Sequence, residues 1–462
     1  MFENIKFTNP FSKLPGNFYT KQSWSSFDQP FLLHFNHDLA KSLGIQEDPE
    51  ELMQIFNGSK NFIKSSPLAM VYGGHQFGNW VNQLGDGRGI LFGQIDSSEG
   101  LVDLHIKGAG KTPYSRFGDG RAVIRSSVRE HLCGEAMFGL GIPSSRSLML
   151  FGSNEPVMRE ETERGAMIVR TAKTHIRFGH FEYFHHNKIA DGVKTLLDHV
   201  IDCYYPNTKQ DSDKYLLFFD ATIKKTACMV SAWQSVGFNH GVMNTDNMSL
   251  SGETIDYGPA AYLDEYNPKK VFSSIDKMGR YSFENQSKIT LWNLARFAET
   301  FLHLIDSNEK TAIKKIEDIL NKYKKLFDQS WLIMMSMKLN LDTNNNNEEI
   351  VKEFLDLMHI YKLDYTNTFL DLENNTLDKK IFKNWEEKYK NNKIRKFKNV
   401  NPQIIPRNHI IEEIINEVYS NNYSQLYEFE KLLKNPYEKI ENKKYITPPL
   451  ESEKVFETFC GT

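Results

Sequence analysis

The chain has 462 residues, of which 40% are hydrophobic and 25% charged, and a formal net charge of −3 at pH 7. A chain of this length is too long for one compact core, so we expect two or three substructures. The nearly neutral charge gives no reason to expect nucleic acid or an anionic membrane as a partner, and no apolar run is long enough to span a bilayer. The N-terminus resembles neither a secretory signal nor a transit peptide. Four cysteines without metal-ligand spacing further favour a cytoplasmic protein: Cys133, Cys203, Cys228 and Cys460.

Glycine is distributed unevenly along the chain. Sixteen of the 28 glycines lie between residues 73 and 152, and none lies between residues 280 and 460. The first region is therefore expected to be rich in tight turns, and the last to be mostly helical. This contrast predicts four parts: an N-terminal arm over 1–70, a glycine-rich lobe over 71–165, a second lobe over 166–283 and a helical region over 284–462.

The hydrophobic periodicity predicts the following elements in chain order. They are short helices over 38–43 and near 50–56, strands over 90–95 and 102–107, a helix over 121–140, strands over 147–152 and 166–170, and helices over 194–205, 214–236, 291–304 and 316–327. The strand over 102–107 alternates with period two, which puts residues 103, 105 and 107 on one face.

The first chemistry-bearing segment is the glycine loop QLGDGRGI at residues 83–90, which includes Gly85, Gly87 and Arg88. Such a loop can bring backbone N–H groups against a phosphate, and Arg88 adds a cation. The loop departs from the dinucleotide pattern G-x-G-x-x-G because position 90 is Ile. By itself it is more typical of a plain hairpin turn with a solvated arginine.

Lys107 ends the alternating strand and is a candidate partner for nucleotide phosphates. The segment KGAGKT at residues 107–112 is not a phosphate-binding P-loop, because that motif requires glycine where the chain has His105. We expect Lys107 to pair with Glu130, which lies 23 residues later on the predicted helix. The alternative is that Glu130 is a solvated helix residue.

Further candidates follow in the next two segments. Asp119 lies in the glycine turn FGDGRA at residues 117–122, where it could cap the helix that follows or accept a hydrogen bond from a base or ribose. Arg170 and Arg177 flank a short polar segment, and arginines are suited to bidentate phosphate contacts. The simpler interpretation is that both are surface arginines near the end of a strand.

Two histidine- and lysine-rich segments are given structural interpretations. Four histidines lie among aromatic residues without the spacing of a metal site, so we expect packing or surface roles for His175, His180, His185 and His186. The basic run at 379–398 also contains acidic residues and Trp385, which favours an exposed helix face over a nucleic-acid surface.

The strongest signal is NHGVMNTDNMSL at residues 239–250, followed by IDYG at residues 255–258. Asp246, Asn247 and Asp256 are hard oxygen ligands of the kind that Mg²⁺ prefers. The segment resembles the catalytic loop and metal-binding turn of protein kinases, which places Asn247 and Asp256 on the metal-binding positions. Val242 stands where a kinase has its catalytic Asp.

Taken together, several long motifs make the chain similar to the SelO family, the selenoprotein O-like pseudokinases also called YdiU proteins. The motifs are YGGHQFG at 72–78, LGDGRG at 84–89, KGAG at 107–110, TPYSRFGDGR at 112–121, HGVMNTDN at 240–247, DYGP at 256–259 and GRYS at 279–282. Motifs this long, in this order and over nearly the whole chain are far more specific than one glycine loop.

The resemblance implies an α+β, protein kinase-like two-lobed fold with an N-terminal arm and a helical C-terminal extension. It implies transfer of AMP from ATP to Ser, Thr or Tyr hydroxyls of protein substrates, with the nucleotide bound in an inverted pose. The family roles fall on matching residues of this chain. The nucleotide pocket would be lined by Gly85, Gly87, Arg88, Asp119 and Gly120. Lys107, paired to Glu130, would contact phosphate, and the outer phosphates would be held by Arg170 and Arg177. Asp246 would accept the proton, and Asn247 and Asp256 would hold Mg²⁺ or Mn²⁺.

The inverted pose also explains the missing kinase Asp. If the α-phosphorus faces the acceptor hydroxyl, a base at position 242 is misplaced, and Asp246 is the carboxylate left to orient the nucleophile. Two other hypotheses remain: a true kinase that uses Asp246 as base, and a non-catalytic nucleotide-binding scaffold.

One feature departs from the family. Relatives often pair a C-terminal cysteine with a second cysteine in the loop after the Asp-Tyr-Gly motif. Cys460 fits the first position, but Phe272 stands at the second. We therefore expect no intramolecular redox lock.

Overall fold

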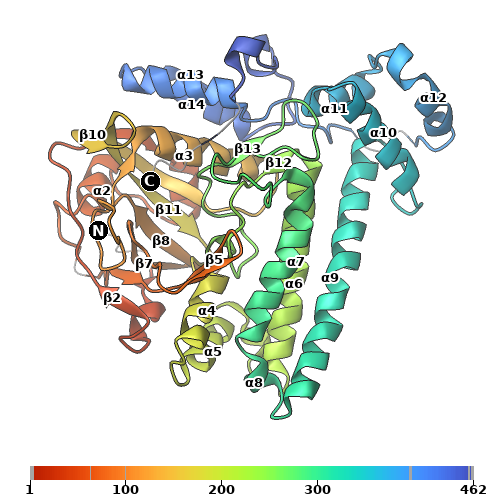
Figure 1. Ribbon diagram of the computed structural model, residues 1–462. Helices are drawn as coiled ribbons and strands as arrows, with labels where there is room; N and C mark the ends of the chain where they lie inside the picture. The colour runs from red at the N-terminus through yellow and green to blue at the C-terminus, as the bar shows by residue number, and fades with distance from the viewer. Residues whose placement is uncertain (1–4, 63, 99, 395–397, 456–457, 459–462) are drawn as a thin grey trace.

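A computed structural model describes residues 5–62, 64–98, 100–394, 398–455 and 458 of the chain. A large β-sheet lies on one side of the molecule and a bundle of long helices on the other, with a smaller helical cluster beyond the bundle (Figure 1). The α+β class is confirmed, while the kinase-like two-lobed arrangement stays a prediction.

The main sheet has nine strands, and each pairs antiparallel with its neighbours. Its path is β2–β4–β7–β8–β11–β10–β3, with β1 paired to β7 and β9 to β11. The strands are β1 (Phe7–Thr8), β2 (Tyr19–Lys21), β3 (Phe31–Phe35), β4 (Leu68–Met70), β7 (Gly89–Ser97), β8 (Gly100–Lys107), β9 (Ala122–Val123), β10 (Arg146–Met158) and β11 (Thr162–Ala172).

The first 70 residues contribute four of these strands and two short helices, α1 (His37–Ser42) and α2 (Pro49–Phe56). Both helices lie where the sequence predicts them. The segment expected as an arm is thus part of the sheet, and Leu68 pairs with Leu91 across the boundary expected at residue 70.

Strand β8 lies between β7 and β11 and carries Lys107, which is opposite Ile168. Leu104 and Ile106 are fully buried in the core, whereas His105 and Lys107 line the cleft described below. The predicted alternation of this strand is confirmed, and it points Lys107 away from the core.

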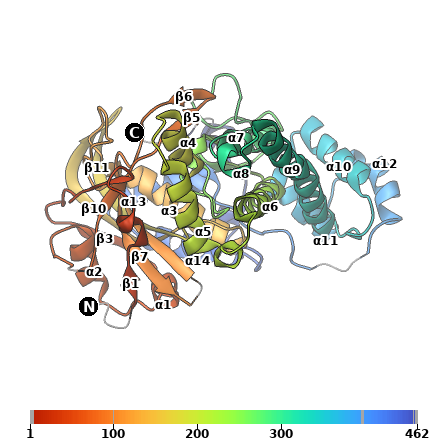
Figure 2. The same ribbon diagram turned by 90° about the horizontal axis from the view of Figure 1, so that it is seen from below.

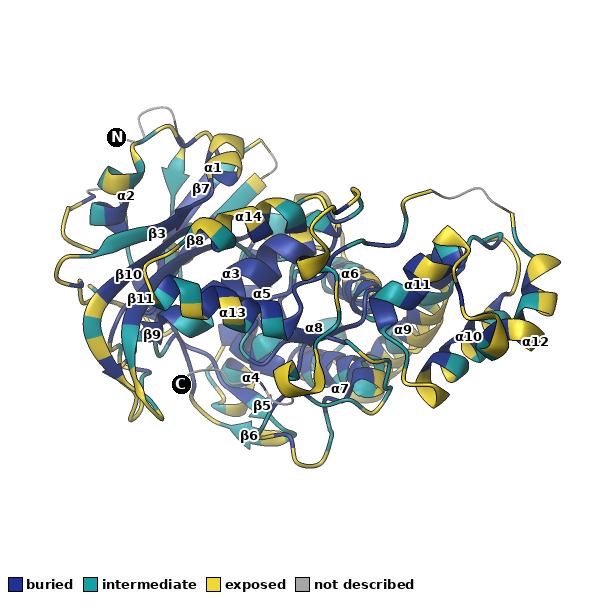
Figure 3. Cartoon of the chain, turned by 90° about the horizontal axis from the view of Figure 1, so that it is seen from above, coloured by how far each residue is buried: buried dark blue, intermediate teal, exposed yellow. Residues whose placement is uncertain are grey.

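Helix α3 (Ile124–Gly139) packs against β10 and β11, and the apolar residues Ile124, Val128 and Leu132 are fully buried. Its other side is buried too, because α13 (Asn408–Tyr419) and α14 (Ser424–Leu433) pack on it. Figure 3 shows α3 and the adjoining strands as mostly buried. Glu130 is 5% exposed, so the alternative of a solvated helix residue is wrong.

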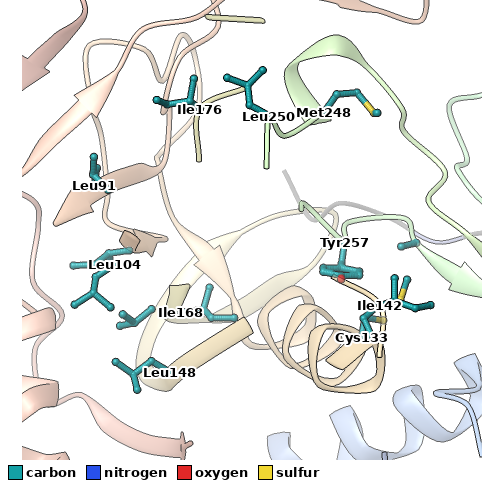
Figure 4. Close-up of a cluster of buried hydrophobic side chains, with 14 of the residues drawn as sticks. Leu91, Leu104, Cys133, Ile142, Leu148, Ile168, Ile176, Met248, Leu250 and Tyr257 are labelled. Carbon is teal, nitrogen blue, oxygen red and sulfur yellow. The ribbon is translucent and has the colours of Figure 1, made fainter. Parts of the chain in front are cut away.

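The core extends from the sheet to the loop that carries Asp256. Figure 4 shows Leu104, Ile168 and Cys133 in this core, and Tyr257 nearby. Tyr257 is fully buried, and its hydroxyl is hydrogen-bonded to that of Ser144. The residue next to Asp256 is therefore anchored in the core.

The helical bundle is formed mainly by α6, α7 and α9, which pack on one another (Figure 1). No helix among the described residues is long and apolar enough to cross a membrane. The bundle and its neighbours are α4 (Phe178–His186), α5 (Gly192–Tyr204), α6 (Lys214–Ser235), α7 (Gln286–Glu299), α8 (Leu302–Ile305) and α9 (Glu309–Lys338).

A second core lies in the distal cluster of α10 (Glu348–Ile360), α11 (Tyr365–Asn374) and α12 (Lys379–Lys390). The basic helix α12 buries Trp385, which stacks on Tyr389 at 4.5 Å between ring centroids. Its lysines face solvent, as expected for an exposed helix face.

After this cluster the chain returns to the sheet side, where α13 and α14 pack on α3. Arg129 of α3 donates to Asn408 and Glu412 of α13, both at 2.7 Å. His34 of β3 lies 2.5 Å from the carboxylate of Glu430 on α14. The C-terminal region is thus tied to the N-terminal strands.

Two short hairpins lie outside the main sheet. One joins β5 (Gly74–Gln76) to β6 (Asn79–Val81), and the other joins β12 (Phe238–Asn239) to β13 (Ala261–Tyr262). The second hairpin brackets the segment with the metal-ligand candidates. The first lies beside α4 and was not predicted (Figure 2).

Candidate active site

A cleft of about 1640 Å³ opens between the sheet and the loops that follow α6. It gathers residues that are far apart in the sequence onto one surface. Every residue predicted for the site lines this cleft except Glu130: Gly85, Gly87, Arg88, Lys107, Asp119, Gly120, Arg170, Arg177, Asp246, Asn247 and Asp256.

Lys107 and Glu130 form a buried ion pair between β8 and α3. Each is 5% exposed, and the Lys107 ammonium also lies 3.9 Å from the Asp256 carboxylate. Burial by itself would raise the pKa of Glu130, but the charges of Lys107 and Arg170 outweigh it and lower this pKa. The carboxylate therefore stays ionised and holds the lysine at the cleft.

Asp256 is enclosed by arginines. Its Oδ1 lies 2.9 Å from Arg170 Nη1, and its Oδ2 lies 2.9 Å from Arg177 Nη1. Burial would raise the pKa of Asp256, but the charges of Arg177, Arg170 and Lys107 hold it well below its usual range. The residue has a φ of 60°, a left-handed conformation that is uncommon outside glycine. An ionised carboxylate is thus held in a fixed orientation.

Asp246 lies in a single 3₁₀ turn, Thr245–Asn247, and is 6% exposed. Its backbone oxygen accepts a hydrogen bond from Arg177 Nη1 at 2.8 Å, so the turn is tied to the same arginine as Asp256. Burial raises the pKa of the Asp246 carboxyl to about 6, although a hydrogen bond from Gln76 and the charge of Arg177 oppose this shift. The group can therefore exchange a proton near neutral pH.

The side chains of Asn247 and His240 stabilise the loop that carries Asp246. Asn247 donates from Nδ2 to the backbone oxygen of Val242 at 2.9 Å, which leaves its Oδ1 as the available ligand atom. His240 Nε2 lies 2.9 Å from the backbone oxygen of Ile255 and so links the two motifs. The amide oxygen of Asn247 and the carboxylate of Asp256 are hard donors on one cleft surface, a set that fits Mg²⁺ or Mn²⁺.

The two glycine loops pack against each other at the cleft. A side chain at Gly120 would place its Cβ 2.1 Å from the backbone oxygen of Gly110, and one at Gly85 would lie 2.5 Å from the ring of Tyr114. Both glycines have positive φ, so both need glycine for conformation as well as space. Arg88 Nη1 is buried and has no hydrogen-bond partner among the described residues. This arginine is available to an anion in the cleft.

Asp119 does not cap α3, so that prediction was wrong. Val123 stands at the N-cap without a side-chain hydrogen bond, because the short strand β9 precedes the helix. Asp119 instead accepts from the backbone N–H of Arg121 and pairs with Arg159, both at 2.8 Å. These contacts hold Asp119 at the cleft rim and do not test its predicted contact with the nucleotide.

The histidines of the predicted packing cluster have protein partners. His175 Nδ1 lies 3.0 Å from Asp103, and His180 Nδ1 accepts from the backbone N–H of Arg177. Burial lowers the pKa of His180 to about 3, so it is neutral. His185 and His186 are exposed.

Another histidine group was not predicted from the sequence. The ligand atoms of His34, His131 and Glu430 lie within 4.8 Å of one another, close enough to share one ion. Glu430 also pairs with Lys434 at 2.6 Å, so its charge is already compensated. These residues join β3, α3 and α14 and do not line the cleft.

The cysteines within the described residues, Cys133, Cys203 and Cys228, are free. Cys460, the candidate redox residue, lies outside the described residues. Phe272 is buried, and its backbone oxygen accepts from the N–H of Thr458 at 2.9 Å.

Sequence reasoning missed the hairpin formed by β5 and β6, which lies directly on the Asp246 turn. Gln76 Nε2 lies 3.2 Å from Asp246 Oδ2, and the His75 N–H donates to Thr245 Oγ1 at 2.7 Å. In the sequence, the motif YGGHQFG carries weight only through the family resemblance. Its two adjacent glycines could have indicated a close backbone approach.

Comparison with known proteins agrees with these features. A family described as "Protein adenylyltransferase SelO" matches residues 1–435. Proteins named Protein nucleotidyltransferase YdiU are similar over their whole length. The one from Bacillus thuringiensis (strain Al Hakam) is 40% identical over 479 residues, 98% of each chain, and the one from Lachnoclostridium phytofermentans is 39% identical over 485 residues, 100% of each chain. The chain therefore belongs to the SelO family of nucleotidyltransferases.

Proposed function

We propose that this protein transfers AMP from ATP to Ser, Thr or Tyr hydroxyls of other proteins and releases pyrophosphate. The observation that carries the proposal is the charge arrangement of the cleft. Lys107, Arg170 and Arg177 are almost fully buried around Asp256, while Asp246 lies beside them and position 242 is a valine. Pyrophosphate is a highly charged leaving group, and a buried group of cations stabilises it.

In the proposed reaction the acceptor hydroxyl oxygen forms a bond to the α-phosphorus, and the bond from that phosphorus to the β-phosphate oxygen breaks. The hydroxyl proton passes to the Asp246 carboxylate. A pKa of about 6 suits this role, because the group is mostly ionised at neutral pH and still basic enough to accept a proton.

Asn247 and Asp256 would hold Mg²⁺ or Mn²⁺. When bound, the ion would neutralise phosphate charge and polarise the phosphoryl oxygens. Arg170 and Arg177 form ion pairs with Asp256 in this structure. When the nucleotide is bound, some of their N–H groups would donate to its outer phosphates instead.

The kinase-like fold is supported by the Lys107–Glu130 ion pair, which links a strand to a helix as in protein kinases. The same pair is compatible with a kinase that uses Asp246 as base. The expected cytoplasmic location is also part of the proposal and is supported by the free cysteines.

ATP labelled at the α- or the γ-phosphate tests the proposal directly. The purified protein is incubated with each nucleotide, Mg²⁺ or Mn²⁺, and a mixture of acceptor proteins. We expect label to enter protein from the α-position alone, with one pyrophosphate released per AMP transferred. Label from the γ-position alone would establish a kinase, and no label from either position with intact ATP binding would establish a scaffold. A mass-spectrometric survey of AMP-modified peptides would then identify the acceptors.

A further inference from the structure

The hairpin of β5 and β6 covers the turn that carries Asp246. Three successive residues contact this turn or its N-cap residue, Asn244. The His75 N–H donates to Thr245 Oγ1 at 2.7 Å, Gln76 Nε2 donates to Asp246 Oδ2 at 3.2 Å, and the Phe77 N–H donates to Asn244 Oδ1 at 3.1 Å. The hairpin is thus attached to the turn at consecutive positions.

Gly74 brings the hairpin backbone against the other oxygen of Asp246. A Cβ at this position would lie 2.7 Å from Asp246 Oδ1 and 3.0 Å from Asp246 Cβ. Oδ1 is buried and has no hydrogen-bond partner among the described residues. Gly74 therefore limits the movement of the carboxylate on one side, while Gln76 holds it on the other.

A buried hydrogen-bond network keeps the hairpin in place. The Glu182 carboxylate on α4 interacts with His75 Nδ1 at 2.6 Å through one oxygen and with the Thr245 hydroxyl through the other. Glu182 is fully buried, so both contacts are shielded from water. The hairpin, α4 and the Asp246 turn form one connected unit.

We propose that Gln76 is a positioning residue for adenylyl transfer, and that it acts with Gly74 to fix the plane of the Asp246 carboxylate toward the acceptor hydroxyl. The proposal rests on the proposed function. Gln76 lines the cleft but acts through Asp246 and not on the nucleotide.

The geometry of proton transfer explains why such a residue is needed. The terminal torsion of an Asp side chain is soft, so an unrestrained carboxylate rotates freely. A general base must reach the hydroxyl within hydrogen-bonding distance, and a small rotation breaks that contact. An ionised carboxylate has about four acceptor positions, so the contact with Gln76 leaves others for the acceptor.

The first test replaces Gln76 by leucine, which keeps most of the volume and removes the amide. We expect the kcat for AMP transfer to fall about tenfold, the loss of one hydrogen bond to a charged group, while the KM for ATP changes less than about twofold. Asn79→Ala is the matched control, because Asn79 pairs with Gln76 across the same hairpin and is exposed. This variant should keep the rate of the unmodified protein.

A double-mutant cycle separates positioning from a structural role. On an Asp246→Asn background, Gln76→Leu should cause no further loss, because the carboxylate that it positions is gone. Gly74→Ala should lower kcat more than Gln76→Leu does in the unmodified protein, and should cost less on an Asp246→Ala background, where the carboxylate is removed and only the Cβ of residue 246 remains close to the new methyl group. Equal losses with and without Asp246, or a raised KM for ATP, would overturn the proposal in favour of hairpin stability.

Hydrogen exchange tests the hairpin contacts independently of the reaction. In Thr245→Val the backbone amide of His75 should exchange faster, while the amides of α9 should be unchanged. Unchanged exchange at His75 would show that the hairpin is not held on this turn. If the unmodified protein transfers no label from α-labelled ATP, the proposed function fails, and with it the positioning of a base. Activity that is insensitive to Gln76→Leu contradicts the positioning role alone.

Discussion

Two carboxylates of the same cleft, Asp246 and Asp256, lie in opposite environments. Both oxygens of Asp256 contact arginines, and its pKa is held well below its usual range. The Asp246 carboxylate accepts a hydrogen bond from the neutral amide of Gln76, while Arg177 donates to the backbone oxygen of Asp246. Burial raises the pKa of the Asp246 carboxyl to about 6. Burial alone would raise the pKa of both carboxyls, so direct contact with a cation decides the direction of the shift.

The difference supports the role proposed for each residue. A carboxylate that stays ionised under all working conditions is suited to hold a metal ion and organise phosphates. A carboxylate whose pKa lies near the working pH is suited to take up a proton. The predictions below test this division of roles.

The largest effect is expected for Asp256→Ala. Loss of this carboxylate removes a metal ligand and leaves Arg170 and Arg177 without their shared partner. We expect AMP transfer to fall by about a thousandfold or more, the equivalent of several kcal/mol of charge stabilisation, measured with α-labelled ATP. Asp220→Ala, which removes the shared partner of Lys224 and Lys322 and does not alter the cleft lining, should leave the rate unchanged. Full activity of Asp256→Ala would contradict the site assignment.

The next effect is expected for Asp246→Asn, which keeps the shape of the side chain and removes the proton acceptor. The rate of transfer should fall by about a hundredfold or more, while the affinity for ATP changes little, because Asp246 does not hold the phosphates. Single-turnover kinetics and calorimetry separate the two quantities. A large loss of ATP affinity with an unchanged rate constant would reverse the roles of the two carboxylates.

A smaller effect is expected for Lys107→Ala. The variant removes one phosphate contact, so the Kd for ATP should rise about tenfold. The buried Glu130 would remain beside Arg170 and stay partly compensated. Exposed Lys111 is the matched control, and its replacement by alanine should leave the Kd unchanged. Calorimetry showing unchanged affinity in Lys107→Ala would remove Lys107 from the site.

The smallest effect is a pH dependence near neutrality. Because burial raises the pKa of Asp246 to about 6, the carboxylate is protonated below this pH and cannot accept the hydroxyl proton. Transfer should therefore fall about tenfold per pH unit below 6 and level off above 7, while ATP affinity stays constant, since Asp256 remains ionised. The measurement is kcat against pH at saturating ATP. An acidic limb near pH 4 would show that bound metal outweighs the burial of Asp246.

The sequence predicted the elements that depend on local patterns. Long amphipathic segments such as α6 and α9 were found, although α9 extends beyond the predicted range at both ends. Glycines in the sequence mark the end of helix α3, but no local signal marks its start. The residues just before the helix form β9, which pairs with β11 about 40 residues later in the chain, and such a distant contact leaves no local pattern. The strands of the first 70 residues were missed for the same reason.

The candidate site was predictable where chemistry imposes residue types. Lys107, Glu130 and the loop with Asp246 and Asp256 were found, and the structure brings them to one cleft or directly beside it. The contact of Gln76 with Asp246 was not predicted, because a glutamine in a glycine-rich segment has many possible partners. Their separation of 170 residues leaves no local pattern to detect.

The attachment of α13 to α3 has a consequence for how the protein is made. Glu412 holds Arg129, one residue before the glutamate that positions Lys107. During synthesis on the ribosome, the wall of the cleft lacks this support until about nine-tenths of the chain has emerged. A product cut short before α13 would expose the flank of α3 that α13 and α14 cover, so chaperones and proteases should recognise and remove the incomplete chain.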